Sequence, residues 1–313
     1  GGGSELGGGK QIEIDSAQNF LVLVSREIFD LWLVSLAQAA GAEVRQGEKV
    51  SAVEAGSGGV TVWTSGRVYN ARVVIGADGV YSTVAKAVRK PFQKKDLAFC
   101  LCSEIGIAER DEPWREGIEV HYGLAPTGYR WIFPRRNRFS AGLGVWLSGT
   151  AKIRDGFLNF LQERGLSREK QIRGRHIPLG GIAHPVVSDG IILAGDAAGF
   201  ADPLTGEGIR YAIASGRLAA ATAASLLARV VTPNRQNLGV YEQNWDHGFG
   251  SDLKAALFIA RLFQHFPRAL CGIFFSGREP LEECLQILQG RIGYRQLYRW
   301  LLWHTPGLIR RSI

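Results

Sequence analysis

The sequence has no methionine, only four cysteines and no uninterrupted apolar run of about 18 residues, the length needed to cross a membrane. The cysteine spacing fits neither a CxxC pair nor a zinc-ligand set, so we expect small buried thiols in a reducing compartment. No secretory signal peptide is recognisable. We therefore expect a soluble or peripheral cytoplasmic protein. The cysteines are Cys100, Cys102, Cys271 and Cys284.

A glycine-rich phosphate loop is also missing. Dinucleotide folds commonly open with a strand, a GxGxxG turn and a helix, and neither GGGSELGGGK, GSGGV nor AGLGVW has that spacing and context. The chain opens on GGGSELGGGK without Met, which is typical of a linker or an exposed loop and consistent with an internal fragment.

Basic residues exceed acidic ones, 37 against 29, and 46% of the 313 residues are hydrophobic. The length allows two domains, and the charge suits an anionic ligand, a membrane surface or nucleic acid. No arginine-rich tract or aromatic-basic RNA motif is present, so we expect no nucleic-acid partner.

The stretch Ile191–Arg217 carries the strongest functional pattern. A short apolar strand leads into a tight turn of small residues around Asp196, and a second turn, Thr205–Gly208, precedes a helix predicted over Ile209–Arg229. Small residues allow close approach to the backbone, and a helix start stabilises an anion. This arrangement suits a dinucleotide. The alternative is an ordinary buried strand–turn–helix whose glycines only cap and turn.

Two further segments repeat this logic. ARVVIGADG is a buried strand ending at Asp78, where Ser82 can cap a short helix, Thr83–Val88; a second ligand-facing turn and a simple capped turn both fit. Arg26 precedes a helical pattern that ends at Gly41. An arginine is unfavourable at a helix N-terminus, which favours an anionic ligand over a solvated side chain.

Strands with alternating aromatic residues are predicted between Leu97 and Ile177. In YRWIFPR, Tyr129, Trp131 and Phe133 alternate and so face one side of a strand. Three rings suit a long apolar substrate or a flavin edge, and they equally suit packing of the sheet against a helix.

GDAAGFADPLTGEGIRYAIASG closely resembles the C-terminal FAD-binding motif of the geranylgeranyl reductase family, which has the p-hydroxybenzoate hydroxylase-like flavoprotein fold. YRWIFPR is similar to the YxWxFPK motif that lines the lipid cavity in that family, with Arg135 in place of Lys. The Asp-Gly turn and the helix after Ser25 resemble further family motifs. The resemblance implies contacts to FAD from Arg26, Val50, Asp78, Asp196, Gly208 and Ile209, and a substrate wall of Tyr129, Trp131, Phe133 and Pro134.

The resemblance also implies a reaction. NADPH or a ferredoxin would reduce FAD, whose N5 would pass a hydride to a carbon–carbon double bond of a polyprenyl chain. No residue is identified as the proton donor, and no metal is expected. The family layout places about ninety residues, with the phosphate loop, before the present start.

The implied fold is α/β (α+β): a Rossmann-like FAD-binding domain without its first βαβ unit, an inserted antiparallel-sheet substrate domain and a C-terminal helical tail. We expect the FAD-binding domain in residues 1–95 and 183–255, the substrate domain in 96–182 and the helical region in 256–313.

Two other functions stay open. An aromatic-ring monooxygenase or a halogenase-like enzyme would share the fold and the GDAAG turn. The YRWIFPR motif, however, is not expected in such an enzyme. A non-catalytic lipid-binding remnant or truncated product would account for the missing phosphate loop. The tail after Gly290 mixes arginines with aromatic residues and leucines, which fits either peripheral contact with anionic lipid or a terminal helix packed on the body.

Overall fold

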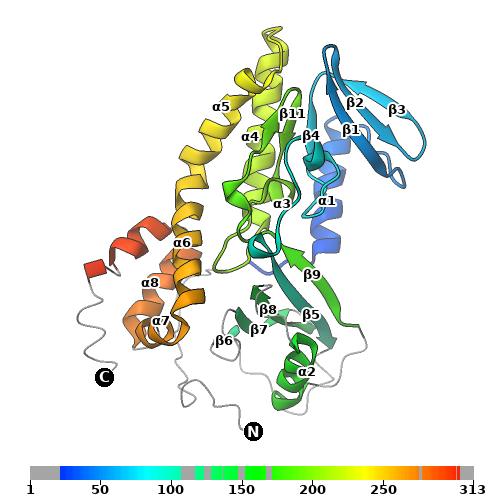
Figure 1. The fold of residues 1–313 in the computed structure, drawn as a ribbon. Coiled ribbons are helices and arrows are strands. Elements are labelled where there is room, and N and C mark those ends of the chain that lie inside the picture. Colours follow the sequence, from blue (N-terminus) through cyan, green and yellow to red (C-terminus); the bar gives the residue numbers. More distant parts are fainter. Residues whose placement is uncertain are drawn as a thin grey trace.

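The structure, a computed structural model, describes residues 22–106, 117–122, 128–135, 137–146, 152–166, 171–274, 277–300 and 302–303. Three sheets lie beside a long set of helices that runs along one side of the molecule (Figure 1). The combination of a parallel strand pair, a five-stranded antiparallel sheet and C-terminal helices confirms the predicted mixed α/β fold.

The central sheet has the order β10-β11-β4, formed by Val187–Ser188, Ile191–Leu193 and Val74–Gly76. β11 is fully buried and pairs in parallel with β4, which explains its unbroken apolar sequence. The helices α4 (Ile209–Ala228) and α5 (Arg235–Trp245) pack beside this sheet, and Tyr241 of α5 donates a hydrogen bond of 2.7 Å to the Leu193 carbonyl. This core fixes the end of β11, from which the functional turn departs.

A small antiparallel sheet and one helix precede the central sheet along the chain. The strands are β1 (Val50–Gly56), β2 (Gly59–Thr64) and β3 (Val68–Ala71), in that order in the sheet. The helix α1 (Arg26–Ala39) ends before Gly41, whose φ of +92° suits glycine, as the sequence predicts. The sequence after Gly41 predicts a strand at 42–45, and this prediction is wrong: the segment has no regular structure and is largely exposed.

The five-stranded antiparallel sheet has the order β6-β7-β8-β5-β9. One face is covered by α2 (Ile153–Glu163), whose Phe157, Phe160 and Leu161 are buried against the sheet. The apolar face of the amphipathic helix α2 is therefore buried against this sheet. The strands are β5 (Ala98–Gly106), β6 (Glu119–Tyr122), β7 (Gly128–Arg135), β8 (Arg138–Trp146) and β9 (Arg173–Ile177), the last not predicted from sequence.

The helices after α4 begin earlier than the sequence pattern predicts. The sequence predicts one helix over 241–254. The structure has there the end of α5 (Arg235–Trp245), a π-helical turn (Asp246–Gly250) and the start of α6 (Ser251–His265). α7 (Pro267–Phe274) and α8 (Arg278–Leu288) follow, and residues 294–300 are also helical. The chain stays helical through the glycine-containing π-helical turn because Trp245 and Phe249 pack on the ring of Phe200.

The predicted tight turn after β11 is a single helical turn, α3 (Gly195–Ala198), and α4 is confirmed nearly to its predicted end. Within the described residues, α4 is the one helix with the length and composition to cross a membrane. Its Tyr211, Ser215 and Ala219 are nevertheless buried in the core, so packing also accounts for its apolar sequence.

Gly199 ends α3 with a φ of +82°, and a Cβ there would lie 2.5 Å from Gly181 Cα. We expect Gly199→Ala to lower the free energy of unfolding by about 2 kcal/mol or more, because strain and a backbone clash combine. Gly216→Ala is the matched control, since a Cβ inside α4 meets nothing within 4 Å and should stabilise by about 0.5–1 kcal/mol. Urea denaturation measures both. Equal stability of the two variants would contradict the role of Gly199.

Candidate functional site

The parallel pairing of β11 with β4 brings two carboxylates to one edge. Leu193 pairs with Gly76, and Asp196 and Asp78 follow those residues closely. Because both strands run in the same direction, their carboxyl ends meet where ligands bind in open α/β sheets. The sequence reasoning identified both carboxylates but could not show that they share an edge.

Asp196 has an unsatisfied carboxylate. Among the residues that the structure describes, none donates a hydrogen bond to it, although burial raises its pKa and the charge of Arg26 acts in the opposite direction. A Cβ at Gly208 would lie 3.3 Å from Asp196 Oδ1, so the glycine leaves room directly beside the carboxylate. An unpaired half-buried acceptor beside a bare backbone is the environment expected for a ligand hydroxyl.

Arg26, the first residue of α1, is close enough to Asp196 for its charge to oppose the rise in the pKa of that carboxyl group. Its guanidinium pairs with Asp30, Nη2 to Oδ2 at 2.9 Å, and its side chain is 64% exposed. The hydrogen bonds that the Arg26 guanidinium donates to the Asp30 carboxylate are the main cause of a raised pKa for Arg26. The charge is permanent and accessible, so it can pair with an anion at the cost of one surface ion pair.

Asp78 has a structural task. Its carboxylate accepts hydrogen bonds from the amides of Thr83 and Val84, at 2.7 and 3.2 Å, and a very short one from the Ser82 hydroxyl. Ser82 Oγ in turn accepts from the Ala85 amide at 2.8 Å, as predicted for a cap. The capped element is a 3₁₀ turn, Val84–Ala87, rather than an α-helix. The capped-turn alternative thus accounts for the contacts of Asp78, and a role toward a cofactor stays a prediction.

The start of α4 carries an acidic cap that the sequence reasoning missed. Glu207 Oε1 accepts a hydrogen bond of 2.7 Å from the Arg210 amide, and the Ile209 amide also stabilises this carboxylate. Burial is the main cause that raises the Glu207 pKa. Glu207 therefore caps the start of α4 in this structure, and anion stabilisation by the backbone of Gly208 and Ile209 stays a prediction.

Residues 202–208 form a compact turn that contacts the antiparallel sheet. The Asp202 amide donates to the Glu207 carbonyl at 2.8 Å, and the Gly206 amide donates to the Asp202 carbonyl at 2.9 Å. The Tyr129 hydroxyl of β7 donates a very short hydrogen bond to the Thr205 carbonyl. This bond connects the predicted substrate strand to the predicted cofactor turn, which are 76 residues apart in the sequence.

The aromatic residues of β7 form a continuous row. The ring centroids of Tyr129 and Trp131 are 5.5 Å apart, and those of Trp131 and Phe133 are 6.1 Å apart. Tyr122 of β6 extends the row at 5.5 Å from Tyr129; its place depends on strand register, so the sequence reasoning missed it. We call these four rings the aromatic row.

The aromatic row does not pack against a helix of its own domain. Arg130 and Ile132, on the opposite face of β7, are buried on the α2 side of the sheet, so strand alternation directs the row away from α2. These rings therefore do not pack against α2, and the choice between packing against another helix and lining a substrate path stays open. The same alternation places Pro134 on the α2 side, and its predicted substrate contact stays a prediction.

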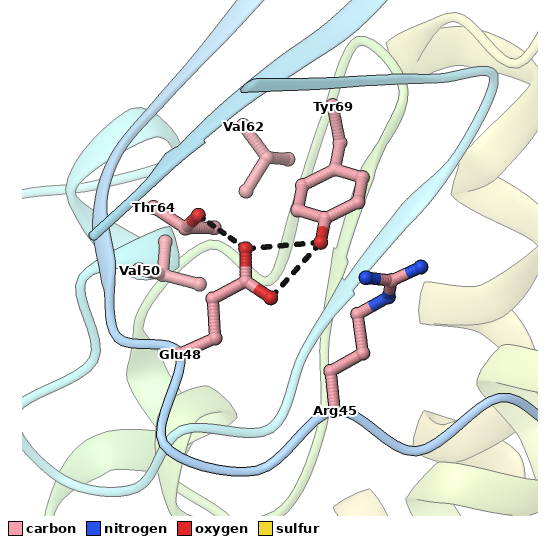
Figure 2. Close-up of a pocket in the computed structure, with 6 residues that line it drawn as sticks. All are labelled: Arg45, Glu48, Val50, Val62, Thr64 and Tyr69. Carbon is pink, nitrogen blue, oxygen red and sulfur yellow. Dashed lines mark hydrogen bonds between the residues drawn. The ribbon is translucent and has the colours of Figure 1, made fainter. Parts of the chain in front are cut away.

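Val50 lies in a different place, at the start of β1, where it lines a hollow of about 220 Å³. Figure 2 shows Glu48 beneath this hollow, accepting hydrogen bonds from Thr64 at 2.6 Å and from Tyr69 at 2.9 Å. Arg45 lies over the Tyr69 ring, 5.8 Å from its centroid. The site is shallow and has one planar aromatic wall.

The cysteines do not offer thiolates in the described part of the chain. All four are free, and burial raises the pKa of Cys100 to about 11 and that of Cys284 to about 12. At neutral pH both remain protonated, so neither is an activated nucleophile. The prediction of buried thiols is confirmed for Cys100, while the other three are half-buried.

Gly142 of β8 makes room for the aromatic row. It pairs with Trp131 across the sheet, and a Cβ at this position would overlap the indole ring. We expect Gly142→Ala to displace Trp131, to change the near-ultraviolet circular dichroism and to lower stability by about 1–3 kcal/mol. Gly144→Ala is the control, because its Cβ would lie at an ordinary 3.6 Å from the same ring. Unchanged spectra in Gly142→Ala would contradict this account.

Comparison with known proteins agrees with this geometry. The family model described as tryptophan halogenase matches residues 14–248. Digeranylgeranylglycerophospholipid reductase 2 of Methanothermobacter thermautotrophicus is 31% identical over 287 aligned residues, which cover 86% of this chain and 69% of that protein. Geranylgeranyl diphosphate reductase of Rhodobacter capsulatus is 36% identical over 231 residues, covering 70% of this chain and 58% of that protein.

Solved structures give the same result for the fold. A geranylgeranyl bacteriochlorophyll reductase-like protein from Thermoplasma acidophilum superposes with a TM-score of 0.71 over 91% of this chain and 73% of that one, at 20% sequence identity. The resemblance inferred from the sequence motifs is confirmed. The chain belongs to the geranylgeranyl reductase family, within the wider group of flavin-dependent oxidoreductases that the tryptophan halogenase model also describes.

Proposed function

We propose that this chain forms the flavin-facing and substrate-facing parts of a FAD-dependent reductase that acts on carbon–carbon double bonds of a polyprenyl chain. The reductant of the flavin would be NADPH or a ferredoxin. The observation that carries the proposal is the hydrogen bond from Tyr129 to the Thr205 carbonyl, which joins the aromatic row to the turn before α4. An apolar channel wall and a cofactor turn in direct contact suit hydride transfer to a long apolar substrate.

Asp196 and Arg26 fit the polar parts of FAD. The unpaired Asp196 carboxylate would accept from a sugar hydroxyl of the cofactor, and Gly208 leaves the space for that approach. Arg26, exposed and close to Asp196, would exchange Asp30 for a phosphate oxygen. Bound FAD would supply the hydride, while these residues only bind and orient it.

The start of α4 would stabilise the reduced form of the flavin. Backbone amides at Gly208 and Ile209 would stabilise negative charge on the reduced ring, since a helix N-terminus favours an anion. Glu207, which already accepts from the Arg210 amide, would have to move or become protonated when that charge develops. Its raised pKa makes protonation easier than for an exposed glutamate.

The hollow at Val50 would receive the adenine end of FAD. Its volume of about 220 Å³ and the Tyr69 ring suit a planar base, and the Val50 backbone would supply hydrogen bonds. Asp78 would act through the turn that it caps, near the cofactor phosphates. The division into a cofactor part (1–95 and 183–255), a substrate sheet (96–182) and a helical region (256–313) belongs to the same proposal.

The aromatic row would line the path of the prenyl chain. Tyr129, Trp131 and Phe133 present ring faces and edges on the side of the sheet that also faces the 202–208 turn. Such a wall offers a polyprenyl chain dispersion contact along its length. The basic tail would add peripheral contact with anionic lipid; Arg310 and Arg311 lie outside the described residues.

A halogenase or aromatic monooxygenase is the second candidate, and the match to the tryptophan halogenase model favours it. The two reactions differ in their need for oxygen. Under anaerobic conditions, a reductase should show reoxidation of its reduced flavin by geranylgeranyl compounds. Oxygen-dependent hydroxylation or halogenation of a ring compound, with no anaerobic reoxidation, would contradict the reductase.

A non-catalytic lipid-binding protein is the third candidate. The chain spans 69% and 58% of the two curated relatives compared above, so the activity of the whole protein is itself a proposal. Flavin absorbance near the visible maxima of FAD, measured after reconstitution with excess FAD, separates this candidate from both enzymes. A colourless protein that still binds prenyl lipid would support it.

Asp196→Asn tests the cofactor site. We expect FAD affinity to fall about tenfold or more, because an amide replaces a charged acceptor for a ligand hydroxyl. Titration of FAD fluorescence measures the dissociation constant. Asp155→Asn is the control, since Asp155 is exposed on α2. Equal affinities for the two variants would show that Asp196 does not hold the cofactor.

Phe133→Leu tests the substrate wall. We expect equilibrium binding of geranylgeraniol to weaken about two- to tenfold, because one aromatic contact is lost from the row. The control is Phe258→Leu, the same substitution at an exposed position of α6. If both variants bind the lipid like the parent chain, the aromatic row does not line the binding path.

A further inference from the structure

Asp202 is a buried carboxylate, 4% exposed, in the centre of the 202–208 turn. Its Oδ1 accepts hydrogen bonds from the amides of Leu204 and Thr205, at 2.9 and 3.0 Å. Because these amides belong to the turn that leads into α4, the carboxylate determines the backbone path to Gly208. The sequence gives no sign of this role, since Asp-Pro is common in turns.

The second oxygen of Asp202 is held from a distant segment. Tyr294 donates a hydrogen bond of 2.7 Å to Asp202 Oδ2, and its side chain is 3% exposed. Tyr294 lies in the helical segment 294–300 and packs with Ile259, Phe274 and Ile287 in a separate apolar cluster. The contact spans 92 positions of the sequence.

We propose that Tyr294 is a positioning residue for the cofactor turn: its hydroxyl holds the Asp202 carboxylate in place, and that carboxylate fixes the amides of the 202–208 turn. The helical region after α6 thereby becomes part of the cofactor site without contacting the cofactor. The inference rests on the proposed function only in assigning flavin to this turn. The effect of Tyr294 on the 202–208 turn does not depend on the proposed function.

The surroundings of Asp202 are rich in phenol hydroxyls. The titratable groups that interact with Asp202 are four tyrosines, from β6, β7, α4 and the 294–300 helix, and the Glu207 carboxylate. These groups are Tyr122, Tyr129, Tyr211, Tyr294 and Glu207. Hydrogen bonds from Tyr294, from the Leu204 and Thr205 amides and from the Thr205 side chain all stabilise the charged form of this carboxylate.

The electrostatic balance gives the direction of a pH effect. Burial raises the pKa of Asp202, and the hydrogen bond from Tyr294 opposes that rise. Burial also raises the pKa of Tyr294, so this hydroxyl stays protonated as a donor. Loss of the Tyr294 hydroxyl therefore raises the pKa of Asp202 further. Asp202 then becomes protonated at a higher pH than in the parent chain, and its hydrogen bonds from the Leu204 and Thr205 amides weaken at that pH.

Hydrogen exchange at the Leu204 and Thr205 amides tests this inference in the chain without cofactor. We expect Tyr294→Phe to accelerate exchange at these amides about tenfold or more after correction for intrinsic rates, since a hydrogen bond to a buried charge is lost. The pH at which protection is lost should also move upward. Asp202→Asn should show fast exchange with no such pH dependence.

Tyr298→Phe is the matched control in the same helical segment. Tyr298 packs edge-on against Phe258 at 5.6 Å between centroids, and its hydroxyl makes no hydrogen bond within the described part of the chain. Equal acceleration in Tyr294→Phe and Tyr298→Phe, or none in Tyr294→Phe, would overturn the inference. FAD titration of the same variants separates the role of Tyr294 from the proposed FAD site. If Tyr294→Phe alters amide exchange but neither the parent chain nor any variant binds FAD, only the assignment of flavin to this turn is contradicted.

Discussion

The buried Asp202 carboxylate controls the arrangement on which the rest of the site depends. Two backbone amides and one phenol hydroxyl surround it, and together they hold the turn between α3 and α4. A carboxylate taken out of water is unfavourable unless its oxygens are paired, so the turn is stable only while these donors stay in place. The position of Gly208 and the start of α4 follow from that requirement.

Three parts of the molecule meet at this turn. The central sheet delivers it through β11, the antiparallel sheet contacts it through Tyr129, and the C-terminal helices contact it through Tyr294. The parts are far apart in the sequence, and the helical set lies along the opposite side of β11 from the small sheet (Figure 1). A reductase with cofactor and substrate in one site needs such a meeting point, because hydride transfer requires close and fixed approach.

Polar groups in the site divide into those that are satisfied and those that are not. Asp78 and Glu48 accept hydrogen bonds from neighbouring amides or hydroxyls, which explains them without a ligand. Asp196 differs, because no described group donates a hydrogen bond to it. This difference is the physical ground for proposing Asp196, rather than Asp78 or Glu48, as the cofactor contact.

The sequence by itself determined the family, the helices α1 and α4, and the carboxylates at the strand ends, because these depend on local pattern and on long matching motifs. It also predicted that Tyr129, Trp131 and Phe133 share a face, since strand alternation is local. Only the tertiary structure decided that this face lies away from α2, that Tyr122 extends the row and that Tyr294 holds Asp202. Strand register and contacts between distant segments depend on how the whole chain packs, and no local pattern encodes them.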